Sequence, residues 1–451
     1  MLFGTPTCHK HKSPEEQLNS TKRAWYVTTL ILFCAGYFLN KKCIFEPVTR
    51  LVYLGIECDT KNQMFWVPEE KIKKLIALVE EILKKGISNF AQLEKVVGKC
   101  RSMSVAVPAA ALYTREQYRT LKNEERPHKR GEGKEIIISK ELREELEMWV
   151  QLSTKLNGAK WKKPGNIRIA MQGFSDSSSR RTAGIFFSST QQRLICAEDL
   201  HEEHLTRHIN EQEGVALKNS VEAICLKFPS EIEGKRVLCR VDSKVLFDIY
   251  NKQGSSSNRF ITNICKTLFW LQIDFSFELK LELVESENNL ADSFTREDTL
   301  NDLRLTNKYY FKIWDAFGPF TYDIMASSSN VKCNTVGEKL KFFSRYFSKG
   351  CEGVDVFTQN LSNLEGLYCF PPICMIAPVL SLLKSQKASA VVVVPDIRDV
   401  WWSTLKEGEV SSLTITQPEQ GDAFMSTKRN GNRMFEKFKH KFLAVKLNFM
   451  S

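Results

Sequence analysis

The amino-acid sequence predicts a multidomain α/β chain with a mixed five-stranded sheet in its central third. The 451 residues exceed what one hydrophobic core usually serves, so about two to four modules are expected. Apolar residues recur at helical spacing between residues 68 and 121, and short apolar runs between polar turns replace that spacing from residue 167. Residues 305–410 mix both patterns again, which favours a second α/β domain.

The first 67 residues predict a polar segment, a helix and a hairpin. Residues 1–20 are polar and contain no secretory signal. Residues 24–39 are apolar, but they include two threonines and are shorter than the roughly 20 residues that a membrane span needs. We therefore expect a buried helix and no membrane contact. The strand candidates LVYLGIECD and MFWVP then flank a polar turn at residues 60–63.

Residues 68–123 predict a basic helical module. Its first apolar residues recur every three or four positions and stop at Gly86: Ile72, Leu75, Ile76, Val79, Ile82 and Leu83. Between Lys61 and Arg130, fifteen basic residues stand against eight acidic ones, a net charge of +7. Such a surface either binds a polyanion such as nucleic acid or is a solvated helix face, and both interpretations stay open. The candidate nucleic-acid contacts are Lys73, Lys74, Lys84 and Lys85.

The middle of the chain predicts a linker and then a five-stranded domain. Residues 124–160 begin with a polar, turn-rich stretch, and we expect a linker there. In residues 161–304 the strands IRIAMQGFSD, GIFFSS and RLICAED precede a helix over about 209–228. The strand GKRVLCRVD, a helix around 261–271, the strand FELKLELVE and a helix opening at NNLADSFTR follow. This order of elements resembles that of a ribonuclease H domain.

The end of the chain and the cysteines complete the outline. Residues 305–410 contain YDIMAS, a helix near 375–383 and the apolar strand AVVVVP, whereas the basic tail at residues 411–451 suggests no fold of its own. The 13 cysteines are scattered, and no CxxC pair occurs. This usage favours reduced thiols inside the cell, in the cytoplasm, the nucleus or both, over a disulfide framework or a zinc site.

Four acidic residues mark the ends of elements in the five-stranded domain. Asp176 ends the first strand, Glu213 lies early in the first helix, Asp242 ends the fourth strand and Asp292 begins the last helix. Taken singly, each of them is more often an ordinary solvated turn residue than a ligand, so the prediction rests on all four occurring together. Crowded carboxylates select hard cations, Mg²⁺ or Mn²⁺, and two such ions about 4 Å apart support phosphodiester hydrolysis.

These segments together resemble the reverse transcriptase and ribonuclease H polyprotein of DIRS-type tyrosine-recombinase retroelements. The resemblance spans about residues 21–405 and is carried by the strings GYFLNKKC, LVYLGIECDTKNQMFWVPEEKIKKL, VVGKCRSMSVAVPAA, HINEQEGVAL, VDSKVLFDIYNKQGSSSN, NNLADSFTR, YDIMASSSN, GVDVFTQN and YCFPP. It implies that residues 21–67 are the end of a polymerase palm and that residues 68–123 are its thumb. It also implies that Asp176, Glu213, Asp242 and Asp292 are ribonuclease H metal ligands.

The sequence departs from this family pattern in three places. No Tyr-x-Asp-Asp string precedes GYFLN, so we expect a truncated polyprotein that cannot polymerise DNA unless a palm-bearing reverse transcriptase polypeptide assists it. After Asp176, three serines with Arg180 and Arg181 replace a small turn containing Trp-Gly, and the arginines are candidate phosphate contacts. No histidine occurs between His208 and His440, although many ribonucleases H use a mobile one near their last aspartate.

Two further segments extend the prediction. Lys252, Asn258 and Arg259 flank a serine-rich loop after the fourth strand and are candidate contacts to a hybrid backbone. Residues 305–410 resemble a phage-type adenine methyltransferase domain. Its catalytic tetrapeptide corresponds to Phe370, Pro371, Pro372 and Ile373, in which the family's leading Asp or Asn and final aromatic residue are replaced.

The expected function is cleavage of the RNA strand of an RNA:DNA hybrid, using two Mg²⁺ or Mn²⁺ ions. Binding to the hybrid through phosphates would weaken steeply with salt, and contacts to 2′-hydroxyl groups would select the RNA strand. The main alternative is a catalytically inactive nucleic-acid-binding remnant of the same element. A protein-interaction scaffold is the third possibility, and it predicts no salt-sensitive hybrid binding.

Overall fold

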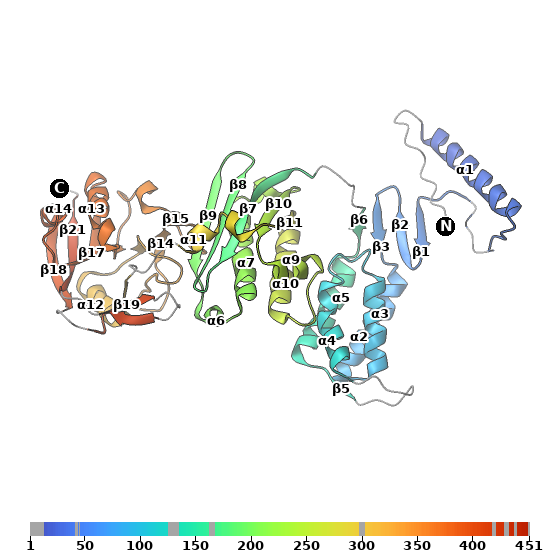
Figure 1. Cartoon of the computed structure of the whole chain (residues 1–451), viewed down its shortest axis with the longest axis horizontal. Coiled ribbons are helices and arrows are strands. Elements are labelled where there is room, and N and C mark those ends of the chain that lie inside the picture. The colour runs from blue at the N-terminus through green and yellow to red at the C-terminus, as the bar shows by residue number, and fades with distance from the viewer. Residues whose placement is uncertain are drawn as a thin grey trace. The chain divides into compact units, whose positions relative to one another are not determined.

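The computed structural model describes residues 13–40, 44, 46–124, 135–161, 167–296, 303–416, 421–427, 433–436 and 440–449. The chain divides into two compact units, Met1–Pro164 and Gly165–Ser451 (Figure 1). Among the helices of the described residues, none is long and apolar enough to cross a membrane.

The first unit begins with a helix and a small antiparallel sheet. Helix α1 (Pro14–Cys34) opens with a capping box at Ser13. The Ser13 hydroxyl accepts from the Glu16 backbone N–H, and the Ser13 backbone N–H donates to the Glu16 carboxylate. The expected helix is therefore present, but the expectation that it is buried is wrong, because large apolar side chains such as Tyr26, Ile31 and Phe33 are exposed. The expected hairpin lies in a four-stranded sheet of order β1-β2-β3-β6, formed by β1 (Arg50–Tyr53), β2 (Ile56–Asp59), β3 (Met64–Trp66) and β6 (Ala159–Lys160).

A helical bundle makes up the rest of this unit. Its members are α2 (Glu69–Lys85), α3 (Phe90–Ser102), the 3₁₀ helix η1 (Leu112–Thr114), α4 (Arg115–Asn123) and α5 (Lys140–Lys155), with a short pair of strands, β4 (Ile87–Ser88) and β5 (Ile136–Ile137). Gly86 ends α2 in the left-handed conformation that favours glycine.

Helix α5 corrects the expectation that residues 124–160 are a linker. Leu142, Leu146 and Trp149 recur at helical steps and are fully buried, and the Trp149 indole donates to the carbonyl oxygen of Tyr113 at 2.7 Å. The Glu145 carboxylate accepts from the first backbone N–H groups of α4, those of Glu116 and Gln117. This segment is therefore part of the bundle core, and residues 125–134 lie outside the described residues.

The five-stranded sheet of the second unit has the expected mixed topology. Its strands are β7 (Ile169–Ser177), β8 (Arg181–Ser188), β9 (Arg193–Asp199), β10 (Arg236–Val241) and β11 (Glu278–Leu283), in the order β11-β10-β7-β8-β9. The first three strands pair antiparallel, whereas β10 pairs parallel with both β7 and β11. The carboxyl ends of β7 and β10 therefore meet at one edge of the sheet.

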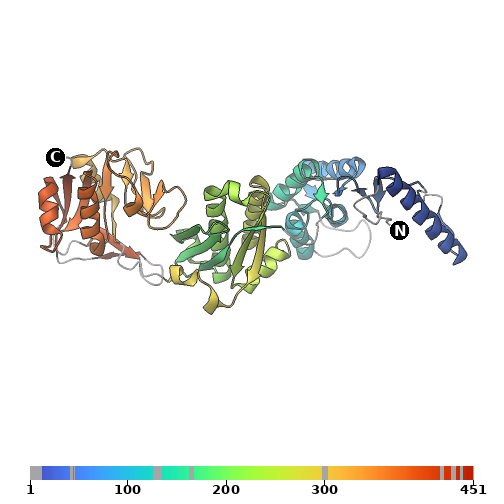
Figure 2. The ribbon, with the colours of Figure 1, turned by 90° about the horizontal axis from the view of Figure 1, so that it is seen from above.

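Helices cover this sheet and set the positions of its polar ends. They are α6 (Glu202–Leu205), α7 (Ile209–Lys227), α8 (Pro229–Ile232), α9 (Lys244–Asn251), α10 (Arg259–Asp274), the 3₁₀ helix η2 (Ser286–Asn288) and α11 (Asp292–Thr295). Helix α7 packs across β7 and β8 and beside α10 (Figures 1 and 2). A Cβ atom at Gly184 of β8 would lie 2.2 Å from the Ser220 hydroxyl, so glycine permits this close helix–sheet approach.

The remaining chain forms a second α/β sheet. Its seven strands have the order β15-β14-β13-β16-β17-β21-β18: β13 (Tyr322–Asp323), β14 (Lys341–Ser344), β15 (Gly353–Val354), β16 (Leu367–Cys369), β17 (Ser389–Pro395), β18 (Glu409–Thr416) and β21 (Phe442–Asn448). The strands from β13 to β17 pair parallel, and the strand order reverses between β13 and β16, as in doubly wound sheets.

Shorter elements complete this part of the chain. They are β12 (Arg304–Leu305), β19 (Phe424–Thr427) and β20 (Arg433–Glu436) in a three-stranded sheet, the helices α12 (Asn307–Phe317), α13 (Ile376–Ser385) and α14 (Trp402–Gly408), and the 3₁₀ helices η3 (Val356–Thr358) and η4 (Ile373–Met375).

Strand β21 corrects the expectation that residues 411–451 form a tail without a fold. It lies between β17 and β18 and pairs antiparallel with both. Its side chains Phe442, Ala444, Val445 and Leu447 are buried, which removes apolar surface from water and anchors the end of the chain in the core.

Candidate metal centre

Three acidic side chains from three different elements meet at the edge where β7 and β10 end. Asp176 is the next-to-last residue of β7, Glu213 lies in the second turn of α7, and Asp242 directly follows β10. One carboxylate oxygen from each lies within 4.8 Å of the other two. Asp176 and Glu213 are buried and Asp242 is half-buried, so water screens the first two poorly.

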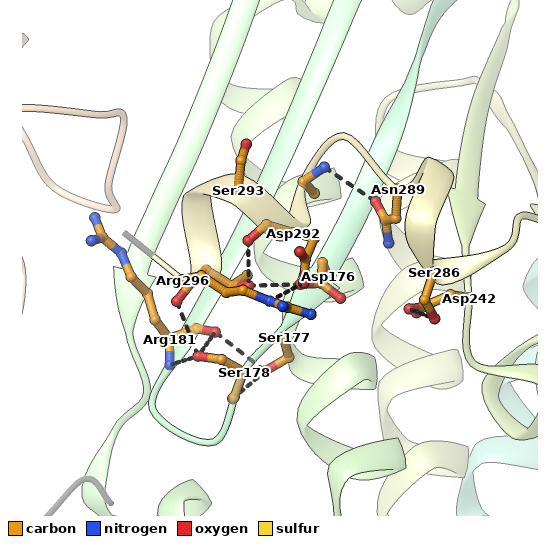
Figure 3. Close-up of polar contacts among 12 residues, drawn as sticks. Asp176, Ser177, Ser178, Arg181, Asp242, Ser286, Asn289, Asp292, Ser293 and Arg296 are labelled. Atoms are coloured by element: carbon orange, nitrogen blue, oxygen red, sulfur yellow. Dashed lines mark hydrogen bonds and ion pairs between the residues drawn. The ribbon is translucent and has the colours of Figure 1, made fainter. Parts of the chain in front are cut away.

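A hydrogen bond holds each of these carboxylates from one side, and Figure 3 shows Ser286 beside Asp242. The Thr295 hydroxyl donates to Asp176 Oδ2 at 2.7 Å, and the Ser286 hydroxyl donates to Asp242 Oδ2 at 2.8 Å. The backbone N–H of Ser177 donates to Glu213 Oε1 at 3.2 Å. Each of the three carboxylates therefore has one oxygen that a hydrogen bond holds in place.

Burial and mutual repulsion of the carboxylates make this cluster favourable for a bound cation. Burial, and then the nearby Asp176 and Asp242 carboxylates, raise the pKa of Glu213 from 4.5 to about 9. Burial also raises the pKa of Asp176, and the Thr295 hydrogen bond opposes that rise. Among the described residues, buried Glu213 Oε2 has no hydrogen-bond partner. Hard oxygen donors crowded in this way fit a divalent cation such as Mg²⁺ or Mn²⁺.

Asp292 lies near this group but is directed to another partner. It is the first residue of α11, and its Oδ1 accepts from Arg296 Nε at 2.7 Å. Its charge contributes to the raised pKa of both Asp176 and Glu213, so it belongs to the same electrostatic environment. The structure thus brings three of the four predicted ligands together and pairs the fourth with an arginine.

The predicted nucleic-acid contacts on helix α2 are all exposed. Lys73 and Lys85 form ion pairs one turn away with Glu69 and Glu81, at 2.7 and 2.6 Å, and Lys74 lies 3.9 Å from Glu70. Lys84 is also exposed. Their role as phosphate contacts stays a prediction.

The predicted contacts of the second unit occupy different environments. Arg180 and Arg181 are buried in and after the β7–β8 turn, and Figure 3 shows the Arg181 guanidinium pointing away from the carboxylates. Asn258 caps α10 through Ile261 N and donates to Glu211 at 3.3 Å. Lys252 and Arg259 are exposed beside this loop. Asn258 therefore stabilises the start of α10, and its contact to a phosphate stays a prediction.

The tetrapeptide in the C-terminal sheet follows β16. The Phe370 ring packs on Phe424 and Phe442, with ring centroids 5.7 and 6.4 Å apart. Pro371 is buried, Pro372 is half-buried and precedes η4, and Ile373 is exposed. The first position thus contributes to the core.

Sequence reasoning missed three side chains around the carboxylates: Thr295, Ser286 and Arg296. The signal for the α11 residues was present, because side chains three and four positions after Asp292 lie on its side of a helix. Ser286 had no such signal, since the bond to Asp242 joins residues 44 positions apart.

Comparisons with known proteins give structural neighbours alone. No family model and no curated protein matches the chain. Ribonuclease H1 from the halophilic archaeon Halobacterium salinarum NRC-1 is similar at 15% identity over 28% of this chain and 92% of its own, with a TM-score of 0.23. LC11-RNase H1 in complex with an RNA/DNA hybrid is similar at 13% identity over 28% and 92%, with a TM-score of 0.25. The foamy viral protease-reverse transcriptase in complex with an RNA/DNA hybrid is similar at 14% identity over 60% of this chain and 34% of its own, with a TM-score of 0.26.

Proposed function

We propose that residues 161–304 form a metal-dependent ribonuclease H domain that cuts the RNA strand of an RNA:DNA hybrid. The observation that carries this proposal is the buried, unpartnered oxygen of Glu213, within a group of three carboxylates from β7, α7 and the end of β10. The mixed five-stranded sheet places these element ends together. A structural ion pair would instead bring a basic side chain into the group.

The cluster residues would hold the cations. Asp176, Glu213 and Asp242 would bind through carboxylate oxygens, while Thr295 and Ser286 keep two of these carboxylates oriented. Bound Mg²⁺ or Mn²⁺, two ions in the proposed mechanism, would activate water and stabilise the leaving oxygen in a displacement at phosphorus. Asp292 is the proposed fourth ligand.

The proposed substrate requires a polyanion-binding surface. The exposed lysines of α2 in the first unit, and separately Lys252 and Arg259 in the second unit, supply positive charge that would contact phosphates. Selection of the RNA strand would come from its 2′-hydroxyl groups. Arg180 and Arg181, which are buried, would act mainly by shaping the β7–β8 turn.

We further propose that the chain is a piece of a DIRS-type retroelement polyprotein that acts inside the cell. The described cysteines are all free thiols, which supports a reducing compartment such as the cytoplasm or nucleus. Residues 21–123 would be the end of a palm and its thumb, and a palm-bearing reverse transcriptase polypeptide would be the partner. The switch point between β13 and β16 supports a methyltransferase-like domain, and the packing of Phe370 supports the loss of its chemistry.

Metal-dependent hydrolysis separates this proposal from a catalytically inactive nucleic-acid-binding remnant. Purified protein is incubated with an RNA:DNA hybrid and Mg²⁺ or Mn²⁺, beside Asp176→Asn and Asp242→Asn. We expect cleavage by the wild type and a loss of at least about a hundredfold in each variant, because the amide keeps the shape but loses the charge that holds the cation. Hybrid binding without cleavage by the wild type would favour the inactive remnant.

A further inference from the structure

Helix α11 presents three polar side chains to the carboxylate cluster within a little more than one turn. Thr295 donates to Asp176, and the Ser178 hydroxyl donates to the Thr295 carbonyl oxygen at 3.2 Å, which ties the end of the helix to the β7–β8 turn. The helix is therefore fixed against the sheet where Asp292 and Arg296 project.

Arg296 neutralises the carboxylate that stands apart from the group of three. Its Nε lies 2.7 Å from Asp292 Oδ1, and Figure 3 shows the arginine side chain turned back toward the aspartate. The Arg296 side chain is 74% exposed and that of Asp292 is 33% exposed, so the ion pair is at the rim of the cluster. A solvent-exposed ion pair of this kind is weak, which lets another cation replace it.

A cation on Asp292 and the Arg296 guanidinium are in direct competition. Both are positively charged and both use the same carboxylate, so binding of one repels the other. A released Arg296 would remain beside the cluster and exposed, with a planar set of N–H donors that matches phosphate oxygens. The phosphates of a bound hybrid are the anions that must come to this rim if the cluster cuts the backbone.

We infer that Arg296 is an exchange residue: it occupies Asp292 in the metal-free protein and moves to a phosphate of the nucleic acid when a cation takes Asp292. This inference rests on the proposed ribonuclease H function. It makes Arg296 a substrate-binding residue and a competitor of the cation at the fourth carboxylate. A helix-stabilising pair with no further role would affect neither cation nor substrate binding.

The first test measures cation binding without nucleic acid. Mn²⁺ uptake by the wild type and by Arg296→Gln is followed by electron paramagnetic resonance. Lys280→Gln is the control, because it removes an exposed positive charge that is paired with Glu282 on β11. We expect Arg296→Gln to bind the weaker Mn²⁺ about two- to fivefold more tightly, with the tighter ion changed less than twofold. Equal affinity for the weaker ion in Arg296→Gln and the wild type would overturn the inference.

The second test measures how Arg296→Gln binds and turns over the RNA:DNA hybrid. The same change should raise KM for the hybrid about three- to tenfold and reduce the salt dependence of hybrid binding by about one phosphate contact. Arg296→Lys keeps the charge but not the planar donors, so it should retain the salt dependence and show part of the rise in KM. An unchanged KM in Arg296→Gln would contradict the phosphate contact.

The two proposals fail in different ways. If the wild type binds Mn²⁺ but cuts no hybrid, the proposed ribonuclease H function is wrong. The exchange at Arg296 is then tested by comparing the Mn²⁺ affinity and the hybrid affinity of Arg296→Gln with those of the wild type. If the wild type cuts the hybrid and Arg296→Gln matches it in Mn²⁺ binding and KM, the exchange fails while the ribonuclease H function stands.

Discussion

Replacing Glu213 by Gln should stabilise the metal-free protein at alkaline pH. The folded protein keeps a proton on Glu213 up to a pKa of about 9, whereas the unfolded chain releases it near the ordinary value of 4.5. The folded state therefore binds more protons throughout this window, and the free energy of unfolding falls as pH rises through it. A glutamine has no proton to lose in either state and still accepts from Ser177 N.

The size of this effect follows from the same two pKa values. At pH 8 the solution lies 3.5 pH units above the ordinary pKa of 4.5, which corresponds to about 5 kcal/mol at about 1.4 kcal/mol per unit. Because Asp176 and Asp242 share the repulsion and relax with it, we expect about 2–5 kcal/mol at pH 8. At pH 5 the difference should be below about 1 kcal/mol.

Urea unfolding in a metal chelator, followed by circular dichroism, measures this difference at several pH values. Glu287→Gln is the matched control, because Glu287 is an exposed residue of η2 in the same domain. Adding Mn²⁺ should stabilise the wild type and have much less effect on Glu213→Gln. If the wild type and Glu213→Gln have equal stability at both pH 5 and pH 8, the pKa of Glu213 is not raised by burial and by its neighbouring carboxylates.

Four further outcomes are expected. Thr295→Val removes the donor to Asp176 Oδ2 at a site that is 1% exposed, so stability at pH 8 should fall by about 1–3 kcal/mol. Mn²⁺ binding should also need a higher pH. Denaturation and Mn²⁺ titration at several pH values check both effects, and unchanged stability and binding would contradict the role of the hydroxyl. Charge reversal of the four α2 lysines should weaken hybrid binding and flatten its salt dependence in fluorescence anisotropy, and an unchanged slope would mean that these lysines solvate the helix. Primer-extension assays on homogeneous protein should show no DNA synthesis, because the sequence lacks the Tyr-x-Asp-Asp string, and reproducible extension would be evidence against this account. Incubation with S-adenosylmethionine and adenine-containing DNA should give no methyl transfer, since Phe370 packs in the core and Ile373 has no aromatic face; incorporation that disappears in a Pro371→Ala, Pro372→Ala double variant would overturn this.

Local patterns predicted most of the five-stranded domain. Short apolar runs between polar turns located β7, β8 and β9, and helical stretches between the strands located α7 and α10. Asp176 and Asp242 were grouped with Glu213 through the resemblance to the ribonuclease H order of elements, and the observed strand order brings the ends of β7 and β10 together. The orientation of Asp292 could not be predicted in this way, because a single rotamer choice directs it to Arg296.

The errors came from non-local packing. Strand β21 is stabilised by pairing with β17, whose residues lie about fifty positions earlier, and seven residues alone give a weak strand signal. Helix α5 follows a polar stretch, which concealed the buried spacing of Leu142, Leu146 and Trp149. The burial of α1 was predicted from apolarity alone, although burial requires a packing partner that sequence periodicity does not supply.

Strand-resolved cleavage of a labelled RNA:DNA hybrid measures the proposed ribonuclease H activity itself. The RNA and DNA strands carry different fluorescent labels, and duplex DNA and duplex RNA of the same sequence serve as competitors and alternative substrates. We expect the wild-type protein to cut within the RNA strand of the hybrid in the presence of Mg²⁺ or Mn²⁺ and to leave the DNA strands intact. Asp176→Asn should lose this cleavage. If the wild-type protein binds the hybrid but leaves its RNA strand intact with either metal, the proposed activity is wrong. The same holds if the Asp176→Asn variant cuts the RNA strand as well as the wild type does.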